Sequence, residues 1–178
     1  MLARKTKYLK PQPSTPNPQH HLILMRHAKT ESPYGFKRDF DRVLTKRGEA
    51  DALKMSEWLK AQVWTIDRVL SSTAERTRQT TRIITETIGL SHSQIEFKDE
   101  LYQATPETFL NALASISIET KTVLIVGHND GITQFANQLS DTRIDHLQPG
   151  SIFAVEWVAD NWQRLEMMKN RFIVYRAP

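Results

Sequence analysis

The chain has 178 residues, 39% of them hydrophobic, which is enough for one domain with a sizeable core. It contains no cysteine, and this excludes disulfides, a thiolate zinc site and a cysteine nucleophile. The net charge of +4 comes from residues 1–21, which hold four basic and no acidic side chains, so the rest of the chain is formally neutral and does not predict a nucleic-acid-binding protein.

Residues 1–20 are expected to form a flexible, basic extension, because four prolines lie among polar side chains between Lys10 and His21. The folded domain is expected over residues 21–178. Its first apolar run, residues 22–25, is too short for a secretory or membrane-spanning segment. We therefore expect a cytoplasmic protein with no membrane partner.

Beyond the extension, short apolar runs alternate with helical patterns, which is typical of an α/β sheet. The apolar runs predict strands at residues 21–26, 67–70, 95–97 and 122–126, and an antiparallel hairpin of residues 151–158 and 162–168. The helical patterns predict helices over residues 45–62, 71–88, 105–117 and 130–139. The sheet is therefore expected to be mixed.

Capping residues mark the starts of three of these helices: Thr45, then Ser71 or Ser72, then Thr105. Gly89 is suited to end the second helix. Several apolar side chains of the first helix lie near one face, namely those of Ala50, Leu53, Trp58 and Ala61.

Three polar clusters directly follow predicted strands: Arg26-His27, residues 71–76, and Gly127-His128. In an open α/β sheet such positions meet at the carboxyl edge, where ligands bind. Two histidines, arginines and the free N–H groups of a helix start are the parts of a phosphate site. The sequence therefore predicts that residues far apart in the chain converge on a phosphoryl group.

With these clusters in place, the sequence resembles the histidine phosphatase superfamily, and most closely its small branch similar to the phosphohistidine phosphatase SixA. The resemblance covers about residues 22–158 and rests on five segments in the same order and spacing: residues 22–30, 41–48, 71–80, 100–102 and 126–129. It implies a three-layer α/β sandwich of the phosphoglycerate mutase type, with a mostly parallel central sheet and an antiparallel C-terminal hairpin. Residues 21–178 would then form one histidine phosphatase domain.

The resemblance also implies roles for individual side chains. His27 matches the nucleophile, whose neutral ring nitrogen attacks phosphorus. Arg26 and Arg76 match the two arginines that bind the phosphoryl group, and His128 matches the second histidine, a hydrogen-bond donor to it. Ser72 is a candidate for a further phosphate-binding hydroxyl, although helix capping explains it equally well.

The sequence leaves open which of three acidic residues donates a proton to the leaving group. Glu100 is the candidate implied by the family, and Asp39 and Asp41 are the reserves. No metal site is predicted, because the remaining histidines show no helical His-x-x-x-His pair or clustered carboxylates, and no cofactor is implied.

Little chain separates Glu100 from His128, so no lid is expected over the pocket. An uncovered pocket favours a phosphorylated partner protein, and we expect a phosphohistidine protein phosphatase. The alternatives are a phosphatase for small sugar or nucleotide phosphates, and a catalytically silent module that binds phosphoproteins.

Overall fold

The computed structural model describes residues 19–32, 38–158, 162, 165 and 170–178. The strands in this part of the chain are β1 (Gln19–Arg26), β2 (Arg68–Ser72), β3 (Ile95–Lys98), β4 (Thr122–Gly127), β5 (Ile152–Val158) and β6 (Arg171–Arg176). The helices are α1 (Lys46–Lys60), α2 (Glu75–Ile88), α3 (Pro106–Ala114) and α4 (Gly131–Leu139), with short 3-10 helices η1 (Asp39–Asp41), η2 (His92–Gln94) and η3 (Asp99–Leu101).

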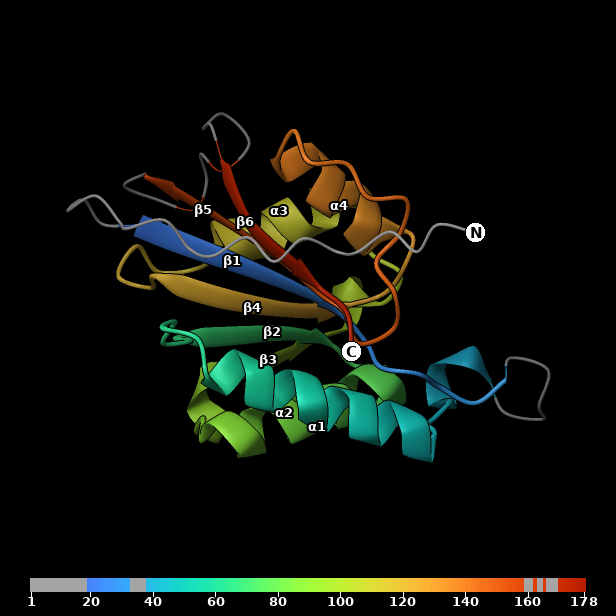
Figure 1. Ribbon diagram of the computed structural model, residues 1–178. Coiled ribbons are helices and arrows are strands. Elements are labelled where there is room, and N and C mark those ends of the chain that lie inside the picture. The colour runs from blue at the N-terminus through green and yellow to red at the C-terminus, as the bar shows by residue number, and fades with distance from the viewer. Residues whose placement is uncertain (1–18, 33–37, 159–161, 163–164, 166–169) are drawn as a thin grey trace, which may run out of the picture.

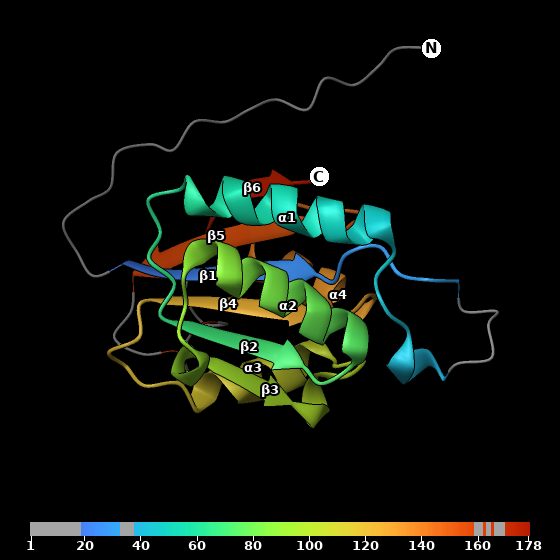
Figure 2. The same cartoon turned by 90° about the horizontal axis from the view of Figure 1, so that it is seen from below.

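The strands form one mixed sheet in the order β3-β2-β4-β1-β5-β6. The first four strands of this order are parallel, β5 is antiparallel to β1, and β6 is antiparallel to β5. Helices α1 and α2 cover one face of the sheet and α3 and α4 cover the other, as Figures 1 and 2 show. The expected three-layer α/β sandwich with a mostly parallel sheet is confirmed.

The alternation of side chains along β1 divides the core into two layers. Ile23 and Met25 pack in the layer that holds the α1 residues Met55 and Leu59. Leu22 and its neighbours on the same face pack in the layer that holds side chains of α3 and α4. Because both faces of the sheet are covered here, the four consecutive residues 22–25 of β1 are all apolar and buried, as is typical of a central strand.

Three local predictions need correction. The partner of β5 in the hairpin is β6, Arg171–Arg176, and not residues 162–168. Within that expected strand Trp162 and Leu165 are buried, and the Trp162 indole donates to the Thr120 carbonyl, while residues 163–164 and 166–168 lie outside the described residues. The buried indole is part of the core and does not belong to a strand of the sheet.

The second correction concerns α1 and α2, the two helices that cover one face of the sheet. Ser71 and Ser72 belong to β2, and α2 begins three residues later with no side-chain cap. In α1 the cap at Thr45 is confirmed. The four apolar side chains that the sequence groups near one face are not the fully buried ones, however; the buried residues of α1 are Gly48, Ala52, Met55, Ser56 and Leu59.

The boundary of the N-terminal extension also moves. The first strand begins at Gln19, so His20 is buried in the sheet instead of lying in the extension. The rest of the expected extension, residues 1–18, lies outside the described residues. Among the described residues, no helix has the length and apolar character that crossing a membrane would need.

At Gly48, helix α1 packs closely against the backbone of the segment that follows His27. A Cβ at position 48 would lie 2.0 Å from the carbonyl oxygen of Lys29, and that oxygen already accepts from the N–H of Thr45. Glycine to alanine normally stabilises a helix by about 1 kcal/mol. Here we expect Gly48→Ala to lower the free energy of unfolding by about 2–3 kcal/mol, measured by urea denaturation, because overpacking outweighs propensity.

The exposed Lys54 of α1 provides the control for this measurement. Lys54→Ala should leave the free energy of unfolding within about 0.5 kcal/mol of the wild-type value. A Gly48→Ala protein as stable as the Lys54→Ala protein would show that the contact with Lys29 is not required.

Candidate active site

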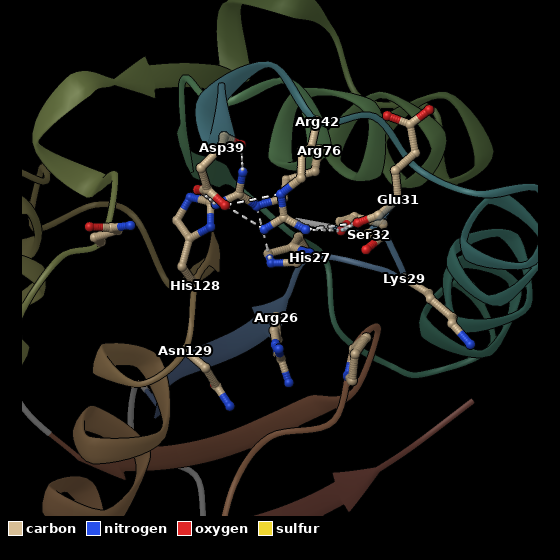
Figure 3. Close-up of a pocket in the computed structure, with 13 residues that line it drawn as sticks. Arg26, His27, Lys29, Glu31, Ser32, Asp39, Arg42, Arg76, His128 and Asn129 are labelled. Atoms are coloured by element: carbon tan, nitrogen blue, oxygen red, sulfur yellow. Dashed lines mark hydrogen bonds and ion pairs between the residues drawn. The ribbon is translucent and has the colours of Figure 1, made fainter. Parts of the chain in front are cut away.

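Three adjacent strands, β2, β4 and β1, end at one edge of the sheet and deliver the expected polar clusters there. Arg26 is the last residue of β1 and pairs in register with Gly127 of β4. The backbone N–H of His27 then donates to the Gly127 carbonyl at 3.0 Å, which fixes the strand end beside His128. The structure thus brings Arg26, His27, Arg76 and His128 to one pocket of about 420 Å³, shown in Figure 3.

Two hydrogen bonds determine which nitrogen of His27 is free to react. The Nδ1 atom lies 2.8 Å from the Ala28 carbonyl oxygen, which only an N–H can satisfy. The Nε–H of Arg76 points at Nε2 from 3.3 Å, so Nε2 presents its lone pair. The neutral Nδ1–H tautomer meets both contacts and leaves Nε2 as the nucleophilic atom.

Burial lowers the pKa of His27 well below its usual range, more than the hydrogen bond to Ala28 raises it. The charges around the ring, including those of Arg76 and Arg26, lower the pKa further. A depressed pKa keeps the imidazole unprotonated near neutral pH, and attack on phosphorus requires that state.

His128 lies beside His27, with 5.2 Å between the ring centroids. Burial lowers its pKa to about 3, and the charge of Arg76 acts in the same direction. Its Nε2 lies 2.9 Å from the hydroxyl oxygen of Ser72. Both active-site imidazoles are therefore neutral over the physiological range.

Arg76 is 3% exposed, and its charge is balanced by Asp39 of η1. Its Nη1 donates to the backbone carbonyl of Asp39, and its Nη2 donates to Oδ2 at 2.9 Å. The same carboxylate accepts from Arg42 and from the Tyr102 hydroxyl. Three side chains, those of Arg76, Arg42 and Tyr102, thus donate to one carboxylate.

The contacts of Asp39 decide its protonation state. Partial burial alone would raise the pKa of Asp39. The hydrogen bonds from Tyr102 and Arg42 and the charge of Arg76 outweigh that effect and hold the pKa well below its usual range. Asp39 is therefore a fixed carboxylate near neutral pH and is poorly suited to donate a proton.

Arg26 is oriented from the side of the sheet opposite to Arg76. Its Nη1 donates to the Leu147 carbonyl at 2.9 Å. The Nδ2 of Asn129 donates to that same carbonyl at 3.1 Å. The segment that leads into β5 therefore positions an arginine of the pocket together with the residue that follows His128.

The remaining candidates lie elsewhere. The carboxylate of Glu100 is 55% exposed and lies 3.6 Å from Lys98, and Glu100 does not line the pocket. Asp41 pairs with Arg38 on the surface and does not line the pocket either. Glu31 does line it, but Figure 3 shows its carboxylate directed away from His27 and His128.

Ser72 is fully buried and does not line the pocket, and its hydroxyl contacts the ring of His128. A direct phosphate contact, as expected from the sequence, is not what this position supports. The residues that sequence reasoning did not single out include Arg42, Tyr102, Gln103 and Asn129. Arg42 and Tyr102 lie within segments that resemble the family, but no local pattern indicates that they meet at Asp39.

Within the part of the chain that the structure describes, no group of three or more histidine, aspartate or glutamate side chains is arranged to hold a metal ion. The polar groups that face the pocket are mainly cationic and neutral nitrogen donors, which suit an anion.

Comparison with known proteins places the chain in a family and shows proteins of the same architecture. The family model described as histidine phosphatase superfamily (branch 1) matches residues 22–104. An uncharacterized protein of Mycobacterium leprae is 36% identical over 169 residues, which cover 86% of this chain and 99% of the relative.

Two solved structures extend the likeness to the whole fold. A protein of Nakamurella multipartitia assigned as phosphohistidine phosphatase SixA has a TM-score of 0.78 at 27% identity, over 94% of this chain and 99% of the other. The protein histidine phosphatase SixA complexed with tungstate has a TM-score of 0.75 at 22% identity, over 88% and 96% of the two chains, which shows the fold alone.

The depressed pKa values of the two imidazoles predict how stability depends on pH. Below the usual value near 6.5 the unfolded chain binds protons at His27 and His128 that the folded chain does not bind. The free energy of unfolding should therefore fall as the pH decreases from about 6.5 toward 3, by up to about 1.4 kcal/mol per pH unit for each imidazole.

His128→Asn removes one of these titrating groups. Urea unfolding at pH 7, 6 and 5 should give a shallower loss of stability for the variant, by up to about 1.4 kcal/mol per pH unit. Parallel pH profiles for the two proteins would contradict the depressed pKa of His128.

Proposed function

Since the chain belongs to the histidine phosphatase superfamily, we propose that it is a metal-independent phosphatase that transfers phosphoryl groups through His27 and acts on phosphohistidine of a partner protein. The observation that carries the proposal is the contact of His27 Nε2 with the Nε–H of Arg76, beside the ring of His128, in a pocket that Arg26 and Arg42 also line.

The proposed reaction has two displacements at phosphorus. In the first, Nε2 of His27 forms a bond to phosphorus while the bond to the leaving group breaks and its electron pair goes to the departing atom. In the second, water attacks phosphorus, the bond to Nε2 breaks, and inorganic phosphate leaves. Arg26 and Arg76 offset the charge of the phosphoryl oxygens in both steps.

The choice of phosphohistidine is supported by the carboxyl groups around the pocket. Asp39 is held as a carboxylate by its cations, Glu31 is directed away, and Glu100 lies outside the pocket. Departure of an alkoxide needs a proton from the enzyme, whereas imidazole, with a usual pKa of about 6.5, can depart as a neutral ring once it is protonated from solvent.

The segment between Glu100 and His128 supports a protein substrate. It is described throughout and forms α3, β4 and their connections. Phe109 and Leu113 of α3 are fully buried in the core, and Gln103 is the one residue between Glu100 and His128 that lines the pocket. A side chain that projects from another protein can therefore reach His27.

Labelling with 32P tests whether His27 carries the phosphoryl group. Wild-type protein incubated with 32P-phosphohistidine protein should acquire acid-labile label, with and without EDTA, and His27→Ala should acquire none. His92→Ala, which changes an exposed histidine outside the pocket, should label like wild type. Wild-type protein that binds phosphopeptide and never labels would favour a silent binding module, and label lost with EDTA would favour a metal enzyme.

Matched peptides test the substrate class. A phosphohistidine peptide should be hydrolysed with kcat/KM at least about 100-fold above that of a phosphoserine peptide of the same sequence, because general acid catalysis typically contributes 10²–10⁴-fold and only the serine alkoxide needs it. Equal values for both peptides would contradict the proposal. Turnover confined to sugar or nucleotide phosphates would establish the small-molecule alternative.

A further inference from the structure

The second histidine of the pocket has one nitrogen with a partner and one without. His128 Nε2 lies 2.9 Å from Ser72 Oγ. Its Nδ1 is buried and has no hydrogen-bond partner among the described residues. The two nitrogens lie on different edges of the ring, so the contact with Ser72 leaves Nδ1 free to serve a bound group.

The hydroxyl of Ser72 has one available hydrogen-bond acceptor among the described residues. Ser72 is fully buried, and its Oγ accepts from the backbone N–H of Ala74 at 3.3 Å. Among the described residues the only acceptor within reach of this hydroxyl is Nε2 of His128. A buried hydroxyl proton without an acceptor costs about 1–3 kcal/mol, so Ser72 is expected to donate to Nε2.

The reverse arrangement would leave two groups unsatisfied. If Nε2 carried the proton, the Ser72 hydroxyl would lack an acceptor, and Nδ1 would present a lone pair to a pocket built for an anion. With Ser72 as the donor, only the Nδ1–H is unpaired. An oxygen of a phosphoryl group satisfies that N–H, whereas it would repel a lone pair.

The backbone holds Ser72 in place for this task. Its carbonyl accepts from the hydroxyl of Thr77 at 2.9 Å, which ties the end of β2 to the start of α2. In β2, Ser71 pairs in register with Val126 of β4, so Ser72 is carried to the level of the last residue of β4. His128 follows that residue directly, and Figure 3 shows its ring beside His27 and Arg76.

We propose that Ser72 is a positioning residue that fixes His128 in the Nδ1-protonated tautomer, so that Nδ1 donates a hydrogen bond to a phosphoryl oxygen in the pocket. The statement about the phosphoryl group rests on the proposed function. The tautomer itself does not, because it is a property of the resting protein. His27 is fixed by a carbonyl and His128 by a hydroxyl, so one ring offers a lone pair and the other a proton.

NMR of protein with 15N-labelled histidine tests the tautomer directly at pH 7. The His128 ring, identified by the signals that vanish in His128→Asn, should show protonated Nδ1 and unprotonated Nε2. A protonated Nε2 in the wild-type protein would overturn the proposal, whether or not the protein hydrolyses phosphohistidine. This measurement needs no variant of Ser72 to fold.

Ser72→Ala and Ser71→Ala form a matched pair of variants. Ser71 is equally buried, but its hydroxyl contacts Thr81 and the backbone instead of His128. In Ser72→Ala the Nε2-protonated tautomer should appear, and the dissociation constant for tungstate, the probe for the phosphate site, should rise about 10-fold, as expected for one lost hydrogen bond. Ser71→Ala should keep the wild-type tautomer and affinity.

Ser72→Cys distinguishes positioning from mere packing, because a thiol fills the same site and donates only weakly. Its tautomer populations and tungstate affinity should lie between those of wild type and Ser72→Ala. If all three Ser72 forms share one tautomer and bind tungstate equally, Ser72 is only a structural residue and the proposal fails. Loss of tungstate binding already in Ser71→Ala would also refute it.

Discussion

The carboxylate of Asp39 neutralises the guanidinium of Arg76, and the arrangement of the pocket depends on this ion pair. Arg76 is almost completely buried, and a buried cation without a partner would be strongly destabilising. Asp39 comes from η1, and its carboxylate is also held by Arg42 and Tyr102. Because Asp39 occupies Nη1 and Nη2, the Nε–H of Arg76 is aimed at His27. The same contacts that orient the arginine keep Asp39 ionised, so one interaction both positions the Arg76 guanidinium and keeps Asp39 from donating a proton.

The order of strands supplies the second constraint. Since β4 lies between β1 and β2, the residues that follow these strands meet without any long loop. The two imidazoles are desolvated together, which keeps both neutral beside two guanidiniums. A neutral imidazole is useful only in the correct tautomer, and each ring has one neighbour that contacts a ring nitrogen: the Ala28 carbonyl at Nδ1 of His27 and the Ser72 hydroxyl at Nε2 of His128.

The same geometry connects the pocket to the proposed substrate. Cationic side chains and neutral ring nitrogens stabilise a phosphoryl group during transfer. They do not by themselves help an alkoxide to leave. The pocket is rich in groups that bind phosphate, and its carboxylates are either held by cations or directed away. Such a site is better matched to a leaving group that solvent can protonate. Phosphohistidine has such a leaving group, and α3 packs into the core rather than over the pocket.

The sequence by itself determined the layers of the fold, the sites where the parallel strands end, and four residues of the pocket: Arg26, His27, Arg76 and His128. These follow from local patterns, because residues close together in the sequence specify a buried strand, a helix cap or a motif. Only the tertiary structure decided that Asp39 pairs with Arg76 while Glu100 faces solvent. The same is true of the contact between Ser72 and His128 and of the pairing of β6, instead of residues 162–168, with β5. Each of these depends on contacts between segments far apart in the chain, whose burial and pairing no local pattern specifies.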